Sequence, residues 1–518
     1  MLRERGDENQ VTSLRPTNAK LKGQKTLPAV KTPDWVKDAI FYQIFPDRFA
    51  KSSRLPKPNN LEPWDTPPTE QGYKGGDLPG VVEHLDYIRD LGATALYFCP
   101  IFQSACNHRY HTHDYYQVDP LLGGNDAFLT LLDEAHGRGM RVVLDGVFNH
   151  ASRGFFQFND ILENGPHSAW LDWFIVEGWP LSPYDGRQPA NYAGWADNRA
   201  LPKFNTDNPQ VREYIMRVAE HWLRLGIDGW RLDVPAEIKT TGFWEEFRQR
   251  VKAINPEAYI VGEIWEAAVP FLRGDRFDAV MNYLFAEAAI AFSAGPRVNP
   301  RLREGKSYHP EKNLDARNYA DRIDWLLGLY PWEINLAQLN LLDSHDAARV
   351  VTLAGGDAAS VHLATLLLMT YPGAPSIFYG DEIGLEGGLP DPDTRRTFPW
   401  DRPHLWKRDV LAYHKELIAF RKAHPALRRG TYHRLYVEDP AGGGADADVY
   451  AFGRKLDADV LLVAVNRAEA ARSVEIPTGD LFGEGAALRA IYGKGEGRVK
   501  NGKLALTIAP RSGVVMTK

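Results

Sequence analysis

Cysteine is scarce in this sequence of 518 residues, which contains only Cys99 and Cys106. Two cysteines at this spacing match neither a disulfide scaffold nor the ligand pattern of a zinc site. We therefore expect free, mostly buried thiols and no metal centre.

Long apolar stretches are missing as well. The longest run, at 361–379, is interrupted by Pro372, Gly373 and Pro375, which predicts a helix followed by a strand and not a membrane span. The first 33 residues are polar and charged, without the apolar centre of a signal peptide. These features predict a flexible tail at 1–33 and a cytoplasmic protein without a membrane partner.

An excess of positive charge is absent too, because the net charge is −6 and the pI is near 6.2. Such a chain offers no broad basic surface for phosphate backbones, so nucleic acid is excluded as a partner. No Ser-His-Asp or Cys-His signature stands out, and GGDLPG at 75–80 lacks the Lys and Ser/Thr of a phosphate-binding loop. Aromatic residues are plentiful by contrast, with 14 Trp and 22 Tyr. Most are expected in the core, and a minority predict flat platforms in a cleft.

Strand-like and helix-like segments alternate over most of the chain at the spacing of repeated βα units. The strand-like segments are 40–49, 94–100, 140–150, 228–234, 258–264, 277–284, 336–346 and 374–384. This order predicts an α/β fold, a (β/α)8 TIM barrel over 34–150 and 205–428. An aromatic-rich segment at 151–204 predicts a small inserted domain, and short strands at 429–518 predict a C-terminal antiparallel β-sandwich.

The stretch DGWRLD at 228–233 carries two opposite charges on a buried strand. Side chains alternate across a strand, so Arg231 and Asp233 point to the same side, about 6 to 7 Å apart. An isolated pair of this kind is usually a structural ion pair. Here three further strand-like segments, LDGVFNH, IVGEIWE and LNLLDSHDAAR, also end in ionisable residues. Such strand ends predict one pocket at the carboxyl end of a parallel barrel.

Three carboxylates in these segments, Asp233, Glu263 and Asp346, suit the cleavage of a glycosidic bond. One acid must protonate the leaving oxygen, and an ionised carboxylate must attack or activate water. Arg231 beside Asp233 is expected to keep that carboxylate ionised. The apolar neighbours of Glu263 are expected to raise its pKa toward that of a general acid.

The segments DGVFNH (145–150), GWRLDVPAE (229–237), GEIWE (262–266) and LLDSHD (341–346) resemble, in order and spacing, the four signature regions of the α-amylase superfamily of retaining glycoside hydrolases. LPKFN at 201–205 and NHRYHTHDYYQVDP at 107–120 resemble motifs of the group of neopullulanases, cyclomaltodextrinases and maltogenic amylases. The resemblance spans roughly 34–518.

The resemblance implies Asp233 as the nucleophile, Glu263 as the acid/base and Asp346 as the third carboxylate. It implies that substrate is also bound by Tyr110, His150, Arg231, Glu237, Trp265, His345, Asp391 and Arg395, and that Asp145 positions Arg231. It implies hydrolysis of the α-1,4 bonds, and also of α-1,6 bonds, in α-glucan oligosaccharides. It implies no cofactor. An exo-acting α-glucosidase or transglucosylase of the same superfamily stays open, as does, remotely, a non-catalytic binding subunit.

The sequence also departs from the group. Its members begin with a β-sandwich that supports a dimer, and a 33-residue tail stands in that place here. The resemblance therefore leaves open a monomer or a dimer unlike that of relatives. In the group's calcium loop only Asn59, Asn60, Gly75 and Asp77 remain as candidate ligands. Calcium needs about six to eight oxygens, so we expect no metal, with calcium as the alternative.

The inserted segment also bears on substrate size, because it contains Trp170, Trp173, Trp179 and Trp195. If half of these form its small core, the others would wall one side of the pocket. We therefore expect a preference for short malto-oligosaccharides and cyclodextrins over starch.

Overall fold

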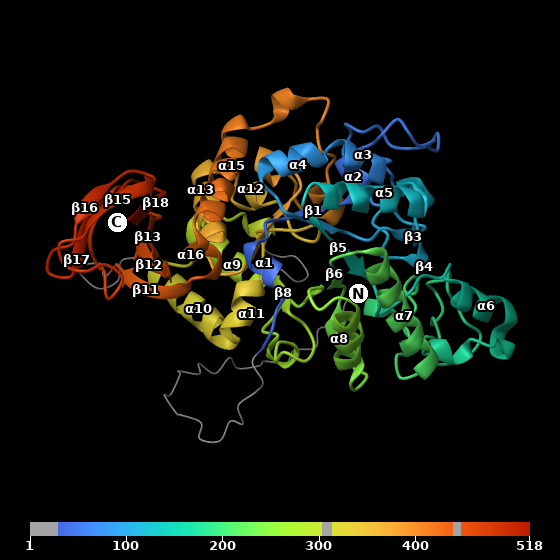
Figure 1. Ribbon diagram of the computed structural model, residues 1–518. Helices are drawn as coiled ribbons and strands as arrows, with labels where there is room; N and C mark the ends of the chain where they lie inside the picture. Colours follow the sequence, from blue (N-terminus) through green and yellow to red (C-terminus); the bar gives the residue numbers. More distant parts are fainter. Residues whose placement is uncertain (1–29, 303–312, 439–446) are drawn as a thin grey trace, which may run out of the picture.

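A computed structural model describes residues 30–302, 313–438 and 447–518. The predicted tail at 1–33 lies almost entirely outside these residues. In the described part, eight parallel strands close into a barrel in the order β1-β10-β9-β8-β7-β6-β5-β2 (Figure 1). They are β1 Phe41–Ile44, β2 Ala95–Phe98, β5 Arg141–Gly146, β6 Gly229–Leu232, β7 Tyr259–Gly262, β8 Ala279–Asn282, β9 Leu339–Asn340 and β10 Ala374–Phe378. The predicted (β/α)8 fold is confirmed.

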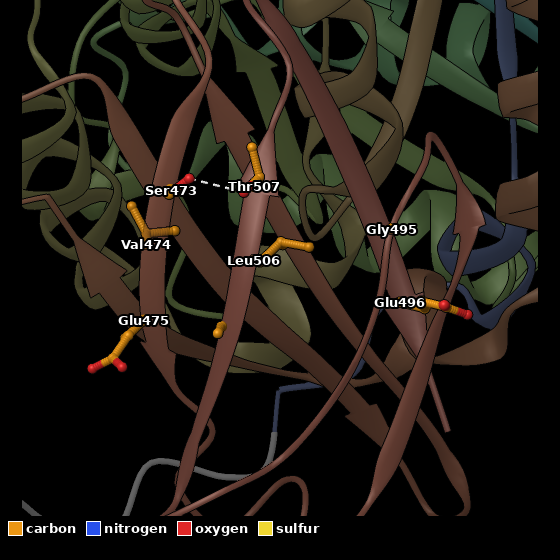
Figure 2. Close-up of a pocket in the computed structure, with 8 residues that line it drawn as sticks. Ser473, Val474, Glu475, Gly495, Glu496, Leu506 and Thr507 are labelled. Carbon is orange, nitrogen blue, oxygen red and sulfur yellow. Dashed lines mark hydrogen bonds between the residues drawn. The ribbon is translucent and has the colours of Figure 1, made fainter.

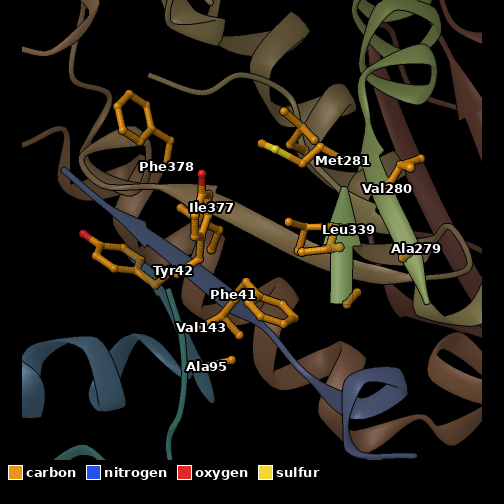
Figure 3. Packing of buried hydrophobic residues seen from close by; sticks show 14 of the residues in the cluster. Phe41, Tyr42, Ala95, Val143, Ala279, Val280, Met281, Leu339, Ile377 and Phe378 are labelled. Atoms are coloured by element: carbon orange, nitrogen blue, oxygen red, sulfur yellow. The ribbon is translucent and has the colours of Figure 1, made fainter. Parts of the chain in front are cut away.

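Helices surround this barrel (Figure 1), and some of the short ones lie in its connecting loops. They are α1 Asp34–Asp38, α2 Pro46–Phe49, α3 Leu78–Glu83, α4 Leu85–Leu91, α5 Gly124–Gly137, α7 Pro209–Leu225, α8 Phe243–Ile254, α9 Tyr283–Ser293, α10 Ala316–Leu329, α11 Trp332–Ala337, α12 Val350–Leu353, α13 Ala358–Thr370, α14 Asp391–Thr394, α15 Arg408–Ala423 and α16 Pro425–Arg429. Because helices pack on the outer face and side chains fill the interior, the strands are apolar and buried almost throughout. Phe41, Leu339 and Ile377 belong to this packed core (Figure 3).

Helix ends follow local signals in the sequence. In α7, Pro209 occupies the first turn and the Asn208 side chain accepts a hydrogen bond from the Gln210 amide. Gly226 ends the helix in the left-handed conformation at φ 113°, which only glycine adopts without strain. The helix therefore stops at the point where the chain must turn into β6.

Several elements differ from the prediction. The first strand ends at Ile44, because Pro46 begins the short helix α2. The helical segment between the first two barrel strands is divided into α3 and α4 at His84. The seventh strand is limited to Leu339–Asn340, and the acidic residues after it lie in a loop. A hairpin formed by β3 Phe102–Ser104 and β4 Thr112–Val118 follows the second barrel strand and was not predicted.

The inserted segment 151–204 leaves the barrel after β5 and lies at the opposite end of the molecule from the C-terminal strands (Figure 1). It contains α6 Phe156–Asn164 and is otherwise held by isolated bridges, such as that between Val176 and Tyr192. Phe158 contacts both Phe174 and Tyr192 edge to face, with ring centroids 4.9 Å apart in each pair. These rings form a small aromatic core.

The C-terminal strands form two antiparallel sheets. The larger has the order β11-β12-β13-β18-β15-β16 and the smaller pairs β14 with β17. Their bounds are β11 Thr431–Val437, β12 Val449–Leu456, β13 Asp459–Asn466, β14 Arg472–Pro477, β15 Ala487–Tyr492, β16 Glu496–Arg498, β17 Lys503–Ile508 and β18 Ser512–Thr517. Leu462, Ile476 and Leu504 meet in a separate core, as in a sandwich of two sheets. The predicted C-terminal antiparallel architecture is confirmed, while the domain boundaries stay a prediction.

A groove on this C-terminal unit is lined by Ser473, Val474, Glu475, Gly495, Glu496, Ala505, Leu506 and Thr507 (Figure 2). None of these lining residues is aromatic, so the groove lacks the flat rings on which sugars stack. Among the described residues, no helix is both long and apolar enough to cross a membrane.

Candidate active site

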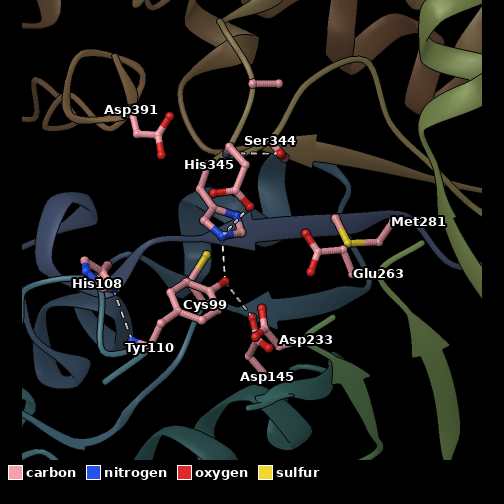
Figure 4. A network of polar contacts seen from close by, with 12 residues as sticks. Cys99, His108, Tyr110, Asp145, Asp233, Glu263, Met281, Ser344, His345 and Asp391 are labelled. Atoms are coloured by element: carbon pink, nitrogen blue, oxygen red, sulfur yellow. Dashed lines mark hydrogen bonds and ion pairs between the residues drawn. The ribbon is translucent and has the colours of Figure 1, made fainter. Parts of the chain in front are cut away.

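The predicted acidic residues meet at the carboxyl ends of neighbouring barrel strands (Figure 4). Asp145 lies near the end of β5, Asp233 directly follows β6 and Glu263 directly follows β7. His345 and Asp346 lie in the loop after β9. In a parallel barrel these ends share one rim, so the topology gathers residues that are more than 200 positions apart.

Arg231 is the centre of the site and is fully buried. Its Nη1 donates to Asp145 Oδ1 at 2.9 Å and to Asp233 Oδ1 at 2.9 Å. Its Nη2 lies 3.0 Å from Glu263 Oε2. One guanidinium thus contacts three buried carboxyl groups. The placement of Asp145 beside Arg231 supports its predicted positioning role.

Glu263 is fixed by two further donors. The Val234 backbone N–H donates to Oε2 at 3.0 Å, and Trp265 Nε1 donates to Oε1 at 3.2 Å. Val234 has φ 35° and ψ 49°, a left-handed conformation that is costly for a β-branched residue. The strained residue is the one that directly follows Asp233 and whose backbone N–H donates to Glu263. The Trp265 ring is held against Tyr283, with ring centroids 3.5 Å apart.

Burial dominates the electrostatics of the cluster. Desolvation and the Glu263 carboxylate raise the pKa of Asp233 well above its usual range, and the attraction of Arg231 opposes this rise. Desolvation likewise raises the pKa of Asp145 to about 6. The expectation that Arg231 keeps the Asp233 carboxylate ionised is therefore not met in the free enzyme, because desolvation outweighs the attraction of Arg231. Asp145 and Asp233 face the same cation and titrate together, so this pair retains a proton to higher pH than isolated carboxyl groups would.

His345 is neutral and has a defined tautomer. Burial and the nearby Arg395 lower its pKa well below the usual range. The Gln43 amide donates to Nδ1 at 2.9 Å, so the proton resides on Nε2. Nε2 lies 3.0 Å from Asp346 Oδ2 and 2.5 Å from the Tyr110 hydroxyl, which donates to Asp145 Oδ2 at 2.9 Å. A continuous chain of hydrogen bonds therefore joins Asp346 to Asp145.

Asp346 is the most accessible of the three predicted catalytic carboxylates, with 29% of its side chain exposed. Arg395 Nη2 lies 3.0 Å from Asp346 Oδ1 and 3.3 Å from Asp391 Oδ2. Arg395 Nε also donates to the His345 carbonyl. These contacts place Arg395 and Asp391 beside Asp346, while their role in binding substrate stays a prediction.

The inserted segment reaches the site through Trp195, which contacts His150. His150 is buried, and its Nε2 has no hydrogen-bond partner within the described protein; such a buried polar atom needs a partner, which a bound molecule can supply. Trp195 stacks on His150 with ring centroids 5.5 Å apart. Glu237 is half exposed and pairs with Lys203 at 3.2 Å. Trp170 and Trp173 pack edge to face against each other at 4.9 Å, whereas Trp195 contacts the predicted site residue His150.

Sequence reasoning missed Gln43 and Tyr97. Gln43 orients His345, and the Tyr97 hydroxyl donates to Asp145 Oδ2 at 3.1 Å. Both are polar residues in otherwise apolar barrel strands. A polar side chain in such a strand was the feature of the sequence that could have identified them. The role of Val234 was missed because it depends on a backbone amide that any residue would supply.

The candidate calcium residues do not fit a calcium site. Asp77 is fully buried and caps α3 by accepting from the Gly80 amide at 2.6 Å. Its Oδ2 accepts from the Ser52 hydroxyl at 3.0 Å and pairs with Lys57 Nζ at 2.8 Å. Asn59 and Asn60 are exposed. The lysine ammonium thus neutralises the carboxylate that would have to bind a cation.

We expect added calcium to leave the free energy of unfolding of the chelator-treated chain unchanged. Lys57→Met should lower that free energy by about 3 kcal/mol, because the substitution leaves the buried Asp77 carboxylate unpaired. Lys51→Met, which removes an exposed lysine of the same loop, is the matched control and should change stability by less than about 1 kcal/mol. Urea unfolding of the chelator-treated chain, with and without added calcium, measures both effects. A decrease on adding EDTA that calcium reverses would contradict the assignment.

Comparison with known proteins identifies the family. The family model "Alpha amylase, catalytic domain" matches residues 43–398. A cyclomaltodextrinase of Geobacillus thermopakistaniensis is 41% identical over 449 residues, covering 86% of this chain and 72% of that protein. The intracellular maltogenic amylase of Bacillus subtilis is 36% identical over 448 residues, covering 86% of this chain and 71% of that protein.

A solved structure agrees with these matches. The debranching enzyme of Nostoc punctiforme is 55% identical, with a TM-score of 0.85 over 94% of this chain and 100% of that chain. Since the barrel, the rim of carboxylates and the sequence matches coincide, this chain belongs to the α-amylase family of glycosidases, with cyclomaltodextrinases, neopullulanases and maltogenic amylases among its relatives.

Proposed function

We propose that the protein hydrolyses α-glucosidic bonds of malto-oligosaccharides and cyclodextrins with retention of configuration. The observation that carries the proposal is the single Arg231 guanidinium in contact with both Asp233 and Glu263 at the ends of adjacent strands. Retaining enzymes need two carboxyl groups about 5 to 5.5 Å apart, and both groups here lie within reach of one guanidinium. The third carboxylate, Asp346, lies in the loop after β9, where its Oδ2 is 3.0 Å from His345 Nε2.

In the first step Glu263 donates its proton to the glycosidic oxygen while Asp233 attacks the anomeric carbon from the opposite face. The bond to the leaving glucan breaks, and the sugar becomes linked to Asp233. In the second step the Glu263 carboxylate takes a proton from water, the water attacks the anomeric carbon, and Asp233 leaves. At the start of the first step the glycosidic oxygen accepts a hydrogen bond from the Glu263 carboxyl group.

The mechanism requires that the first product be the α-anomer. We expect proton NMR of maltotriose hydrolysis to show the α-anomeric signal before mutarotation, with the β-anomer growing only later. Early appearance of the β-anomer would contradict a covalent intermediate on Asp233.

The substrate class follows from the walls of the site. Trp195 stacks on His150 beside the catalytic rim, and an aromatic wall narrows a pocket toward a chain end or a small ring. The Geobacillus relative is named a cyclomaltodextrinase and the Nostoc relative a debranching enzyme. These names support cyclic and short α-1,4 glucans and α-1,6 bonds as substrates. An exo-acting α-glucosidase or a transglucosylase would share the same carboxylates.

We expect kcat/KM per molecule to be higher for maltotriose and cyclodextrins than for soluble starch, with glucose and maltose as the main products. Trp195→Ala should lower kcat/KM for the short substrates about tenfold, since an aromatic contact contributes about 0.5 to 1.5 kcal/mol beyond its buried area. Trp179→Ala, at a 41% exposed tryptophan of the same segment, is the matched control. Fastest cleavage of starch with early release of long oligosaccharides would instead indicate an endo-amylase.

We also propose a cytoplasmic location, supported by the printed name of the Bacillus subtilis relative, an intracellular maltogenic amylase. The oligomeric state stays a prediction, either a monomer or a dimer unlike that of relatives. Light scattering of the purified chain measures it.

A further inference from the structure

A cluster of metal-ligating side chains lies outside the catalytic carboxylates. Cys106, His108 and His111 offer ligand atoms that all lie within 4.8 Å of one another. They belong to the connection between β3 and β4, with the spacing Cys-x-His-x-x-His. We propose that this cluster binds one zinc ion, or a similar divalent cation that prefers thiolate and imidazole, at the border of the catalytic pocket.

The geometry suits tetrahedral zinc. Cys106 Sγ lies 3.5 Å from His108 Nδ1. Zinc bonds of about 2.3 Å to sulfur and 2.0 to 2.1 Å to nitrogen place tetrahedral S and N ligands about 3.5 Å apart. The His108 and His111 rings pack edge to face at a centroid distance of 5.1 Å, and the ligand atoms of all three side chains lie within 4.8 Å of one another, so the His111 side chain must move closer when a metal binds. A water molecule would complete four ligands.

The nitrogen that faces the thiol is the unprotonated one. The Tyr110 backbone N–H donates to His108 Nδ1 at 3.2 Å (Figure 4). Nδ1 is therefore an acceptor, and its lone pair is the form that a metal requires. Bound metal would replace this hydrogen bond, which ties the metal site to Tyr110 in the catalytic pocket.

The loop that carries the cluster is held in place. The buried Asn107 side chain donates to the Glu70 and Gly72 carbonyls at 2.9 Å each. Arg109 Nε pairs with Asp119 at 3.0 Å, and Arg109 Nη1 donates to the Asn107 carbonyl at 2.7 Å. A loop fixed at residues between the ligands loses little conformational entropy when a metal binds.

The surrounding charge makes Cys106 the decisive ligand. The positive charges of Arg395 and Arg153 act on His108 and His111 respectively, and they oppose any cation held by neutral imidazoles alone. The thiol must lose its proton to bind, so each bound ion releases one proton and supplies one thiolate. This chemistry favours zinc and disfavours calcium, which takes oxygen ligands.

Cobalt(II) is a direct probe, because a cobalt–thiolate bond produces a charge-transfer band in the near ultraviolet. We expect the metal-stripped full chain to bind one Co²⁺ with this band, and Zn²⁺ to displace it. Cys106→Ser should abolish the band, and His111→Asn should retain the thiol but weaken Co²⁺ binding at least about tenfold, since even outer contacts of a metal site contribute about 10 to 100-fold. Cys99→Ala removes the other, fully buried cysteine and should leave the band intact.

Thermal unfolding without metal shows whether each variant is folded. The cobalt band does not depend on glycosidase activity, so a failure of the metal proposal is distinct from a failure of the proposed function. Absence of the band in the wild-type chain at saturating Co²⁺ would overturn the proposal. Persistence of the band in Cys106→Ser, or unchanged affinity in His111→Asn, would also overturn it.

Discussion

Replacing Asp233 by Asn should lower kcat by about four orders of magnitude or more, the range found when one member of a catalytic unit is removed. The amide cannot attack the anomeric carbon, although it can still accept from Arg231 Nη1, which now contacts Asp233 at 2.9 Å. Glu263→Gln should cause a loss of similar order, because the proton donor is removed. The double variant should be little worse than either single one, since the two groups act in the same steps.

Azide separates the two roles. With Glu263→Ala, azide should attack the glycosyl-Asp233 intermediate and give the α-glycosyl azide. With Asp233→Ala, it should occupy the place of the nucleophile and give the β-glycosyl azide. Glu245→Gln, at a partly exposed residue of α8 that pairs with Arg276, is the control and should retain activity. A variant at Asp233 or Glu263 that keeps most of its activity would move the assignment to other residues.

Removal of Arg231 should be the most damaging single change to stability. Arg231→Leu leaves the buried Asp145, Asp233 and Glu263 without their shared cation. Breaking a buried ion pair from one side costs about 3 to 5 kcal/mol, and we expect a loss in this range at pH 8 together with the loss of activity. Arg250→Leu, which removes a half-exposed arginine paired with glutamates on the surface, should cost less than about 1 kcal/mol.

The loss should depend on pH in a defined direction. The folded-state pKa of Asp145 is about 6, above the ordinary value of 3.8, and that of Asp233 is also raised. A carboxyl with a raised folded-state pKa contributes full stability below its unfolded pKa and loses it as the pH rises through the folded value. Without Arg231 these values rise further, so the variant should be closest to wild type at pH 5. Urea unfolding at pH 5 and pH 8 measures the difference. A deficit that is larger at pH 5 would contradict this account.

The barrel was predictable because its signal is local and repeated. Apolar segments such as 94–100 and 258–264 alternate with helices that start and end at recognisable residues, as Asn208 and Gly226 do for α7. The carboxylates were predictable from their position at strand ends, since parallel strands of a barrel present those ends on one rim. Their named roles came from the resemblance of four short segments and stay proposals.

The sequence by itself therefore determined the fold class, the C-terminal antiparallel unit and the residues gathered at the rim. Tertiary structure decided what no spacing in the chain encodes: that Arg231 is shared by three carboxyl groups, that Gln43 sets the tautomer of His345, and that Lys57 neutralises Asp77. The cluster of Cys106, His108 and His111 is local by contrast, and the sequence prediction missed it because only the spacing of the two cysteines was weighed. The physical reason for what tertiary structure decided is that pKa values and hydrogen-bond partners depend on burial and on contacts between distant segments, which local pattern does not specify.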